Sequence, residues 1–142
     1  MSKLIEIITK DGSFTLKSEF FQENFHSLKG ALEETKIKFT NPSYLQRFNG
    51  NSLSVLDICF GLGYNSASLF SDLLKQNSFL NWYALEIDKK PLEYSLRNKS
   101  FLKLWHPKVS KIFKHLYQKN QYIDQSFQCN IIWGDARKGI NN

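Results

Sequence analysis

A short apolar run that ends in two glycines constrains the fold of this chain more than any other feature. The run extends from Leu53 to Phe60, between Asn49-Gly50-Asn51 and Gly61-Leu62-Gly63. Continuous apolar segments of this length are typical of strands that are buried on both faces. A helix-like pattern follows from Asn65 to Leu74. The sequence therefore predicts a buried strand, a tight glycine turn and a helix.

The same succession of strand and helix continues along the chain. Further strands are expected at Trp82–Ile87 and Cys129–Trp133. Between them, Pro91 is suited to begin a helix whose apolar face continues to Leu102, and Pro107 begins another with strong helical periodicity. This β-α-β-α-β order is that of half a doubly wound parallel sheet, so we expect an α/β fold with a Rossmann-like sheet.

The segment that precedes this pattern has a different character. Apolar residues alternate on either side of Asp11-Gly12, which is a strong signal for a β-hairpin over Leu4–Leu16. Ser18 is suited to cap a helix, because aromatic residues and leucines follow it at helical spacing. Gly30 would divide that helix into two. We therefore expect a hairpin followed by short helices.

Length and composition exclude wholesale disorder and collagen-like or low-complexity character. The chain has 142 residues, a net charge of +6 and a hydrophobic content of 42%, which is that of a folded protein. We expect an N-terminal hairpin and helical extension, residues 1–50, and a partial nucleotide-binding domain, residues 51–142.

Glu6 interrupts the apolar N-terminal stretch, so no export signal or membrane span is expected and a cytoplasmic location follows. Cys59 and Cys129 form no Cys-x-x-Cys pair, which argues against a disulfide framework or a metal site.

Candidate ligand-binding residues stand where the three expected strands end. In an open α/β sheet, ligands bind at the carboxyl ends of the strands. Gly61 and Gly63 would let the main chain approach a ligand closely, or would simply form a tight turn. Glu86 would accept hydrogen bonds from ribose hydroxyls, whereas Asp88 more simply caps the next helix. Asp135 would accept a hydrogen bond from an adenine amino group, or would serve as a turn residue.

Together these features favour an adenosine-containing ligand. A dinucleotide-binding G-x-G-x-x-G motif would require a third glycine where this chain has Ser66. S-adenosylmethionine has no pyrophosphate to place on a helix N-terminus and needs no third glycine. The sequence therefore favours the methyl donor over NAD.

Several blocks of the chain, taken in order, resemble one family. They are Thr9-Lys-Asp11-Gly12-Ser13-Phe-Thr15-Leu16-Lys-Ser18, His26-Ser27-Leu-Lys-Gly30-Ala31-Leu-Glu-Glu34, Val55-Leu-Asp57-Ile-Cys59-Phe60-Gly61-Leu-Gly63-Tyr-Asn65, Leu85-Glu86 and Gly134-Asp135-Ala136-Arg137. With these blocks the chain is similar, nearly from end to end, to the MnmC-type methyltransferase domain. This domain is the methyltransferase half of a bacterial enzyme that completes 5-methylaminomethyl-2-thiouridine at the wobble position of tRNA. The Asp-Gly-Ser and His-Ser-x-x-Gly-Ala blocks are more specific than the glycine loop.

The resemblance implies a class I methyltransferase sheet that binds S-adenosylmethionine. The donor-binding positions of the family's motifs correspond to Asp57, Gly61, Gly63, Glu86 and Asp135. Glu34 would hold the ammonium group of the donor or cap neighbouring main chain. The implied reaction is methylation of the 5-aminomethyl group of 2-thiouridine, which an associated FAD-dependent oxidoreductase would supply. Cys59 departs from the family, which usually has a glycine there, and its side chain would intrude on the methionine portion of the donor.

The family also continues beyond the last matching block, with further strands and a catalytic Asp-Ala-Phe-x-Pro-type segment. The chain is therefore expected to be truncated at its C-terminus and to leave the Leu53–Phe60 strand as an unpaired, apolar edge. Its catalytic residues stay unknown, and we expect the isolated chain to be inactive. The alternative is a non-catalytic remnant or half-protein that binds tRNA or a separately encoded C-terminal half.

Basic residues are concentrated in one part of the sequence. Residues 89–119 contain nine Lys or Arg and one acidic residue, Glu93. Such a segment would attract the phosphates of tRNA, or it would form the solvated faces of two amphipathic helices. The sequence leaves both interpretations open.

Overall fold

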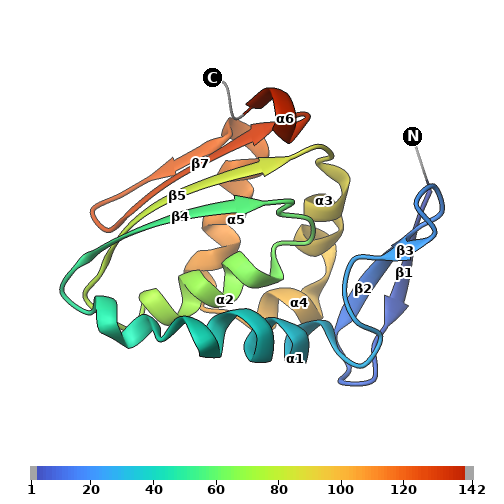
Figure 1. Ribbon diagram of the computed structural model, residues 1–142, viewed down its shortest axis with the longest axis horizontal. Coiled ribbons are helices and arrows are strands. Elements are labelled where there is room, and N and C mark those ends of the chain that lie inside the picture. Colours follow the sequence, from blue (N-terminus) through green and yellow to red (C-terminus); the bar gives the residue numbers. More distant parts are fainter. Residues whose placement is uncertain (1–2, 140–142) are drawn as a thin grey trace.

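The computed structural model describes residues 3–139, which form two β-sheets and a layer of helices (Figure 1). The small antiparallel sheet has the strand order β1-β2-β3, and the larger sheet has the order β4-β5-β7-β6. In the larger sheet β4, β5 and β7 are parallel, and β6 pairs antiparallel with β7. The strands are β1 (Leu4–Ile8), β2 (Phe14–Ser18), β3 (Glu23–Asn24), β4 (Ser52–Ile58), β5 (Phe79–Glu86), β6 (Gln121–Ile123) and β7 (Phe127–Trp133).

The helices connect these strands and pack against them. The first helix continues through a π-helical turn, Lys36–Thr40, and two 3₁₀ turns, Asn41–Ser43 and Leu45–Phe48, before the larger sheet begins. The α-helices are α1 (Ala31–Thr35), α2 (Tyr64–Leu73), α3 (Lys90–Arg97), α4 (Lys99–Lys103), α5 (Pro107–Lys119) and α6 (Ala136–Gly139). None of the helices within residues 3–139 is long and apolar enough to cross a membrane. The order of these strands and helices gives the mixed α/β architecture that the sequence predicts.

The N-terminal hairpin is confirmed, but the helix predicted directly after Ser18 is wrong. That segment forms turns and the short strand β3, and Phe20 and Phe21 are 74% and 69% exposed. The helix begins only at Ala31, because the hairpin turn supplies acceptors for its first N–H groups. Ser13 Oγ accepts from Ala31 N at 3.1 Å, and Asp11 Oδ2 accepts from Glu33 N at 2.9 Å. A cap that comes from a distant turn is not visible in local spacing.

Two further differences concern the C-terminal part of the structure. The apolar face expected from Pro91 to Leu102 belongs to two helices, because Asn98 ends α3 and caps α4 by accepting from Phe101 N at 2.8 Å. Strand β6, which extends the sheet beyond β7, is too short to leave a pattern in the sequence. The predicted strands β4, β5 and β7 and the helices α2 and α5 are confirmed.

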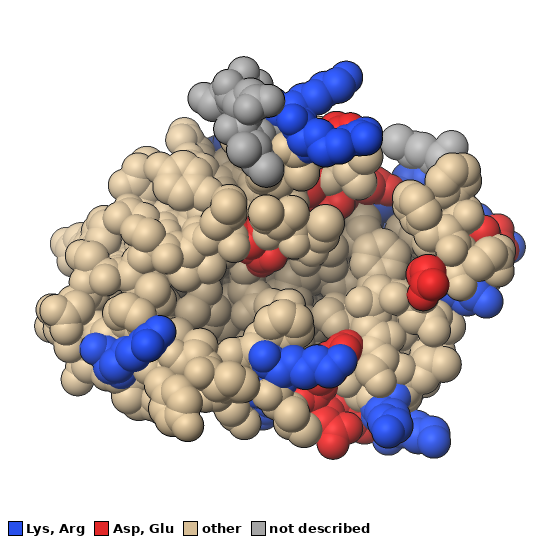
Figure 2. Space-filling model, in the orientation of Figure 1, with Lys and Arg blue, Asp and Glu red and all other residues tan. Residues whose placement is uncertain are grey.

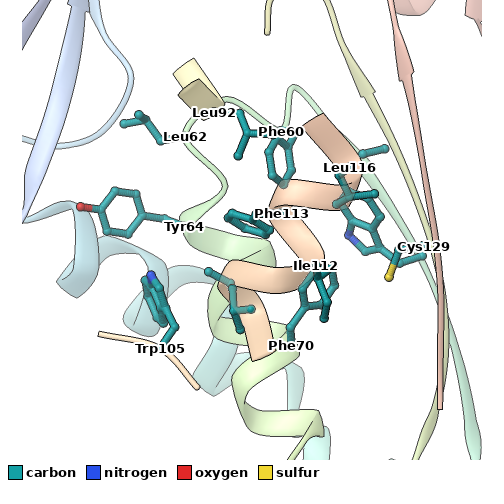
Figure 3. Packing of buried hydrophobic residues seen from close by; sticks show 14 of the residues in the cluster. Phe60, Leu62, Tyr64, Phe70, Leu92, Trp105, Ile112, Phe113, Leu116 and Cys129 are labelled. Atoms are coloured by element: carbon teal, nitrogen blue, oxygen red, sulfur yellow. The ribbon is translucent and has the colours of Figure 1, made fainter. Parts of the chain in front are cut away.

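The hydrophobic core lies between the helices and one face of the larger sheet (Figure 3). Trp82 of β5 is fully buried, with its ring centroid 5.6 Å from Phe60 and 5.4 Å from Phe70. Residues of the hairpin join the same cluster, among them Phe14. Tyr64, the first residue of α2, accepts from Phe14 N at 3.2 Å and donates to Phe14 O at 2.8 Å. The hairpin and the helices of the larger sheet therefore share one core.

The opposite face of the larger sheet has no covering layer in the described structure. The helices α2 and α5 lie on the same side of the sheet (Figure 1). On the other side, large apolar residues of the three parallel strands are between 46% and 59% exposed: Leu56, Ile58, Tyr83 and Ile132. Strand β4 also lies at the end of the strand order, which confirms the predicted edge within residues 3–139.

Candidate functional site

The loops that carry the candidate residues lie at one edge of the larger sheet. Strands β4, β5 and β7 are parallel neighbours, so their carboxyl ends are adjacent. Ile58 pairs with Leu85, and Glu86 pairs with Trp133. Gly134 N also donates to Glu86 O at 2.8 Å, which holds the third loop against the end of β5. The three loops thus share the position at which open α/β sheets bind ligands.

Glu86 is fixed toward the glycine loop by main-chain hydrogen bonds. Its side chain is buried, with the residue 8% exposed. Oε2 accepts from Gly61 N at 2.6 Å, while Oε1 accepts from Ile87 N at 2.7 Å and Asp88 N at 3.0 Å. A carboxylate offers about four acceptor sites. These three bonds therefore orient Glu86 and leave it capacity for a hydroxyl donor.

The two glycines of the loop have different surroundings. Both have positive φ values, +57° at Gly61 and +82° at Gly63, which favour glycine. A Cβ atom on Gly63 would lie 2.6 Å from Phe60 Cζ and 2.8 Å from the Phe113 ring. A Cβ atom on Gly61 would come no closer than 3.3 Å to Phe25. Gly63 therefore permits close core packing, whereas Gly61 borders a cavity.

Asp57 lies at the end of β4 in a network of buried polar groups. Ser66 Oγ donates to Asp57 Oδ2 at 2.5 Å, and Trp82 Nε1 donates to Ser66 Oγ at 2.9 Å. Burial raises the pKa of Asp57, and the nearby carboxylate of Glu86 raises it further. The network joins the first turn of α2 to strands β4 and β5. Ser66 thus has a packing and hydrogen-bonding role at the position where a dinucleotide motif has glycine.

A cavity of about 170 Å³ adjoins Gly61 and contains the carboxylate of Glu34. Glu34 Oε2 accepts from Ser27 N at 2.8 Å, and Lys38 Nζ lies 2.7 Å from Oε1. Burial acts to raise the pKa of Glu34, but the bonds from Lys38 and Ser27 outweigh it and the pKa is lowered. The cavity is lined by Phe25, His26, Glu34, Phe39, Cys59, Phe60, Gly61, Tyr64 and Asn65. Glu34 therefore caps main chain and also faces a cavity beside the glycine loop.

His26 shares this cavity and is held between Glu34 and Tyr64. Its Nδ1 lies 3.5 Å from Glu34 Oε2, and its ring centroid is 5.0 Å from that of Tyr64. Burial lowers the pKa of His26, although Glu34 acts in the opposite direction. A neutral imidazole at this position can donate to Glu34 through one nitrogen and leave the other as an acceptor.

Asp135 follows β7, which β5 separates from β4 and its glycine loop in the strand order. Its Oδ2 lies 2.5 Å from Arg137 Nη2, and Oδ1 accepts from Arg137 N at 3.0 Å. The hydrogen bonds from Arg137 lower the pKa of Asp135 to about 2. Beside it, Trp133 donates from Nε1 to Asn120 Oδ1 at 2.9 Å, and Lys89 Nζ lies 5.1 Å from its ring centroid. Asp135 thus follows β7 at the same sheet edge, and the ring of Trp133, the last residue of β7, is fixed by Asn120.

Cys59 has the backbone conformation of a glycine and borders two cavities. Its φ is +64°, and it is exposed. It lines the small cavity beside Gly61 and also a larger groove along β4. Figure 2 shows this side of the molecule hollowed between the larger sheet and the N-terminal hairpin, with acidic side chains inside the hollow. Among residues 3–139, no group of three His, Cys, Asp or Glu is placed to hold a metal ion.

No protein-family model matches the chain. It is 45% identical over 139 residues to the uncharacterized protein MJ0670 of Methanocaldococcus jannaschii, covering 93% of this chain and 36% of that protein. The crystal structure of MnmC2 from Aquifex aeolicus matches all of this chain, with a TM-score of 0.80 and 26% identity.

The chain resembles MnmC2. The match confirms the likeness to the MnmC-type methyltransferase domain that the sequence blocks indicate. It spans 46% of the MnmC2 chain, so it corresponds to less than half of that protein. The MnmC2-like part includes both the hairpin and the glycine loop, because all of this chain is covered.

The structure also brings residues to the site that the sequence interpretation missed. Phe25, from the N-terminal segment, lies beside Gly61. Ser66 donates to Asp57 and accepts from Trp82. The spacing of Phe25 fits a helix, but no helix forms there, so the sequence does not indicate its position beside Gly61. The signal for Ser66 is the buried Trp82, because the indole N–H of a buried tryptophan generally requires an acceptor.

Proposed function

We propose that this chain is the donor-binding part of an S-adenosylmethionine-dependent methyltransferase of the MnmC2 type. It supplies the first half, β-α-β-α-β, of a Rossmann-like class I methyltransferase sheet. The substrate of the complete enzyme is the 5-aminomethyl group of 2-thiouridine at the wobble position of tRNA. The hydrogen bond from Gly61 N to Glu86 Oε2, 2.6 Å long, is the observation that carries the proposal. It joins the glycine loop to an acidic residue at the end of the neighbouring strand.

The residues at the sheet edge suit the parts of this donor. Glu86 retains an acceptor site for the ribose hydroxyls, in the role that acidic residues have after the second strand of such folds. Glu34 and His26 offer a carboxylate and an imidazole to the amino-acid end, in the cavity of about 170 Å³ beside Gly61. Asp135 and Trp133 are suited to adenine, through a hydrogen bond and a flat contact surface. These roles are complementary, so the donor set fits the group.

The chemistry requires more than these residues. S-adenosylmethionine, when bound, supplies an electrophilic methyl group. Glu34, Glu86 and Asp135 bind and orient, and the glycine loop excludes water from one side of the donor. Attack by an amine requires its neutral form and close alignment. We assign the group that positions the amine to a part of the enzyme beyond residues 3–139.

A dinucleotide-binding function is less well supported. The third glycine of that motif allows a helix to pack closely on a strand. Ser66 has that position here, is 2% exposed and uses its hydroxyl between Asp57 and Trp82. A serine that bridges a helix to two strands replaces the packing that glycine would provide, which favours the methyl donor.

The basic segment 89–119 supports tRNA as the partner. Lys111 and Lys114 line one exposed side of α5, and neither has an acidic partner within the described part of the chain. Lys108, in contrast, pairs with Asp124 at 2.5 Å, and Arg97 pairs with Glu93. We propose that the unpaired lysines of α5 contact tRNA phosphates while the wobble base is flipped toward the sheet edge.

Titration calorimetry with S-adenosylmethionine tests the proposal on the chain itself. We expect saturable binding that Glu86→Gln weakens at least tenfold. One oxygen of Glu86 accepts from Gly61 N and the other from Ile87 N and Asp88 N, whereas glutamine has only one acceptor oxygen. Glu93→Gln is the matched control, since that residue only pairs with Arg97 on the surface of α3. Unfolding of both variants in urea separates a binding effect from a folding effect. Absence of saturable heat, or equal binding by Glu86→Gln, would overturn the proposal.

A further inference from the structure

Two phenylalanine rings line the small cavity beside Gly61 without belonging to the hydrophobic core. Phe25 and Phe39 are 37% and 51% exposed, whereas Phe60 and Tyr64, which also line the cavity, are 5% and 1% exposed. Phe60 and Tyr64 pack edge-to-face against other rings of the core. Within residues 3–139, neither Phe25 nor Phe39 has a contact with another aromatic ring. Their rings are therefore open to a ligand in the cavity.

Phe25 is held beside the glycine loop by hydrogen bonds to the hairpin. Phe25 N donates to Leu16 O at 2.8 Å, and His26 N donates to the hydroxyl of Thr15 at 3.1 Å. The segment between β3 and α1 thus passes the loop that joins β4 to α2 (Figure 1). A Cβ atom on Gly61 would lie 3.3 Å from Cδ1 of Phe25 and 3.7 Å from Cε1. The ring of Phe25 therefore has a fixed place against the main chain of Gly61.

Phe39 reaches the cavity from an unusual helical turn. It belongs to the π-helical segment Lys36–Thr40, in which Asn41 N donates to a carbonyl five residues earlier. Turns of this kind are rare and are frequently found at functional sites. Thr40 Oγ1 donates to Ser68 Oγ at 2.8 Å, which fixes the end of the turn to α2. The turn therefore gives the ring of Phe39 a defined position in the cavity lining.

Gly61 lies between the two ends of the proposed donor site. Its N–H donates to Glu86, the residue proposed for the ribose, and the adjoining cavity contains Glu34, which is proposed for the amino-acid end. Pockets for a whole drug-sized ligand measure about 300–1,000 Å³. This cavity measures about 170 Å³, so it receives only one portion of the donor. The sulfonium group joins the ribose to the amino-acid chain, so it is the portion that would lie next to Gly61 and Phe25.

A sulfonium group is a cation that cannot donate a hydrogen bond, so polar side chains bind it poorly. An aromatic ring attracts a cation that lies within about 6 Å of the ring centroid, and quaternary ammonium ligands are recognised in this way. Among the described residues, the lining of this cavity includes no lysine or arginine. Burial lowers the pKa of His26, which keeps the imidazole neutral. The cavity therefore suits a cation without hydrogen-bond donors.

We propose that Phe25 and Phe39 bind the sulfonium group of the donor through cation–π contacts and so select S-adenosylmethionine over S-adenosylhomocysteine. The assignment rests on the proposed function and gives two residues of that site a role in specificity. S-adenosylhomocysteine has the same adenosine and amino-acid groups but lacks the methyl group and the positive charge. Rings that only covered the glycine loop would stabilise both ligands alike. The ratio of the two affinities is therefore the quantity that these rings control.

Titration calorimetry of the full chain with both ligands measures this ratio. Phe25→Leu and Phe39→Leu each keep an apolar side chain but remove the ring. Each should weaken binding of S-adenosylmethionine about three- to tenfold and leave that of S-adenosylhomocysteine within about twofold. Sinefungin, which carries a C–NH₃⁺ group in place of the sulfonium, is a second cationic probe and should follow S-adenosylmethionine. Phe21→Leu, 69% exposed on the turn after β2, is the matched control and should bind all three ligands like the wild type.

The outcomes separate the role of the rings from the donor site itself. A loss confined to the two cationic ligands, with Phe25→Tyr keeping the wild-type ratio, supports the proposal. Equal losses for charged and neutral ligands, or no loss for either, would overturn it and leave the donor site in place. Absence of saturable heat with all three ligands would overturn the proposed function and this assignment together. If Phe25→Leu fails to fold in urea titrations, Phe25→Tyr and Phe39→Leu decide.

Discussion

Replacing Gly63 by alanine tests whether this glycine serves core packing rather than ligand approach. The added Cβ would meet Phe60 Cζ at 2.6 Å and two Phe113 ring atoms at 2.8 Å. Both rings are buried, at 5% and 0% exposure, so they have little room to move. The backbone conformation is also unfavourable for alanine, because φ is +82°.

Gly12 allows the two costs to be separated. Its φ is +83°, nearly that of Gly63, but no atom lies within 4 Å of a Cβ built on it. Gly12→Ala should therefore cost only the left-handed backbone, about 1–2 kcal/mol. Gly63→Ala should add an overpacking cost of about 1–3 kcal/mol. The total for Gly63→Ala is then about 2–5 kcal/mol, a large part of the roughly 5–15 kcal/mol that stabilises a small domain.

Urea unfolding followed by far-UV circular dichroism measures both variants. The expected result is a midpoint for Gly63→Ala well below that of Gly12→Ala, with both below the wild type. Equal midpoints for the two variants would refute the packing argument, since they differ only in what surrounds the new methyl group. A normal midpoint with lost donor binding in Gly63→Ala would instead assign the residue to the ligand.

Three more results are expected. Burial acts to raise the pKa of Asp11, but hydrogen bonds from Ser13, Glu33 and Thr9 lower it from 3.8 to about 2. The contribution of Asp11 to the stability of the fold is therefore complete above pH 3.8 and is lost as the pH falls toward 2. Asp11→Asn should thus lower stability at pH 7 by about 1–2 kcal/mol and flatten the acid side of the stability curve, as measured by urea unfolding against pH. Cys59→Gly should relieve a positive φ, leave stability within about 1 kcal/mol of the wild type and strengthen donor binding in calorimetry; weaker binding would show that the sulfur belongs to the site. Lys111→Ala and Lys114→Ala should each reduce the slope of log affinity for tRNA against log salt by about one, whereas Lys75→Ala, paired with Asp72 at 3.0 Å, should leave it unchanged.

The parallel sheet was predictable because buried strands and amphipathic helices leave clear patterns in the sequence. The run from Leu53 to Phe60 and the periodicity after Pro107 each correspond to one element of the structure. The segment from 19 to 30 was not predictable in this way. Phe21 and Phe25 have helical spacing, but they lie in turns, and only distant acceptors on Asp11 and Ser13 determine where the helix begins.

The candidate site was predictable in outline for the same reason. Counting along the chain places Glu86 at the end of the second strand, and the structure joins it to Gly61. The hydrogen-bond support of Asp57 was not predictable, because Ser66 and Trp82 meet only when α2 packs on β5. The roles of Glu34 and Asp135 toward a donor stay predictions, since each already has a basic partner in the structure, Lys38 and Arg137.

The position of Tyr64 ties two distant segments of the fold together. Its hydroxyl accepts from Phe14 N and donates to Phe14 O. Burial raises the pKa of Tyr64 to about 12, so the hydroxyl stays protonated at any physiological pH. The residue also follows Gly63 directly, so a shift in the hairpin would be transmitted to the turn at the start of α2. The N-terminal fifty residues are thus no detachable appendage, and a minimal domain trimmed to begin at Ser52 would lose the brace that sets the shape of its glycine turn.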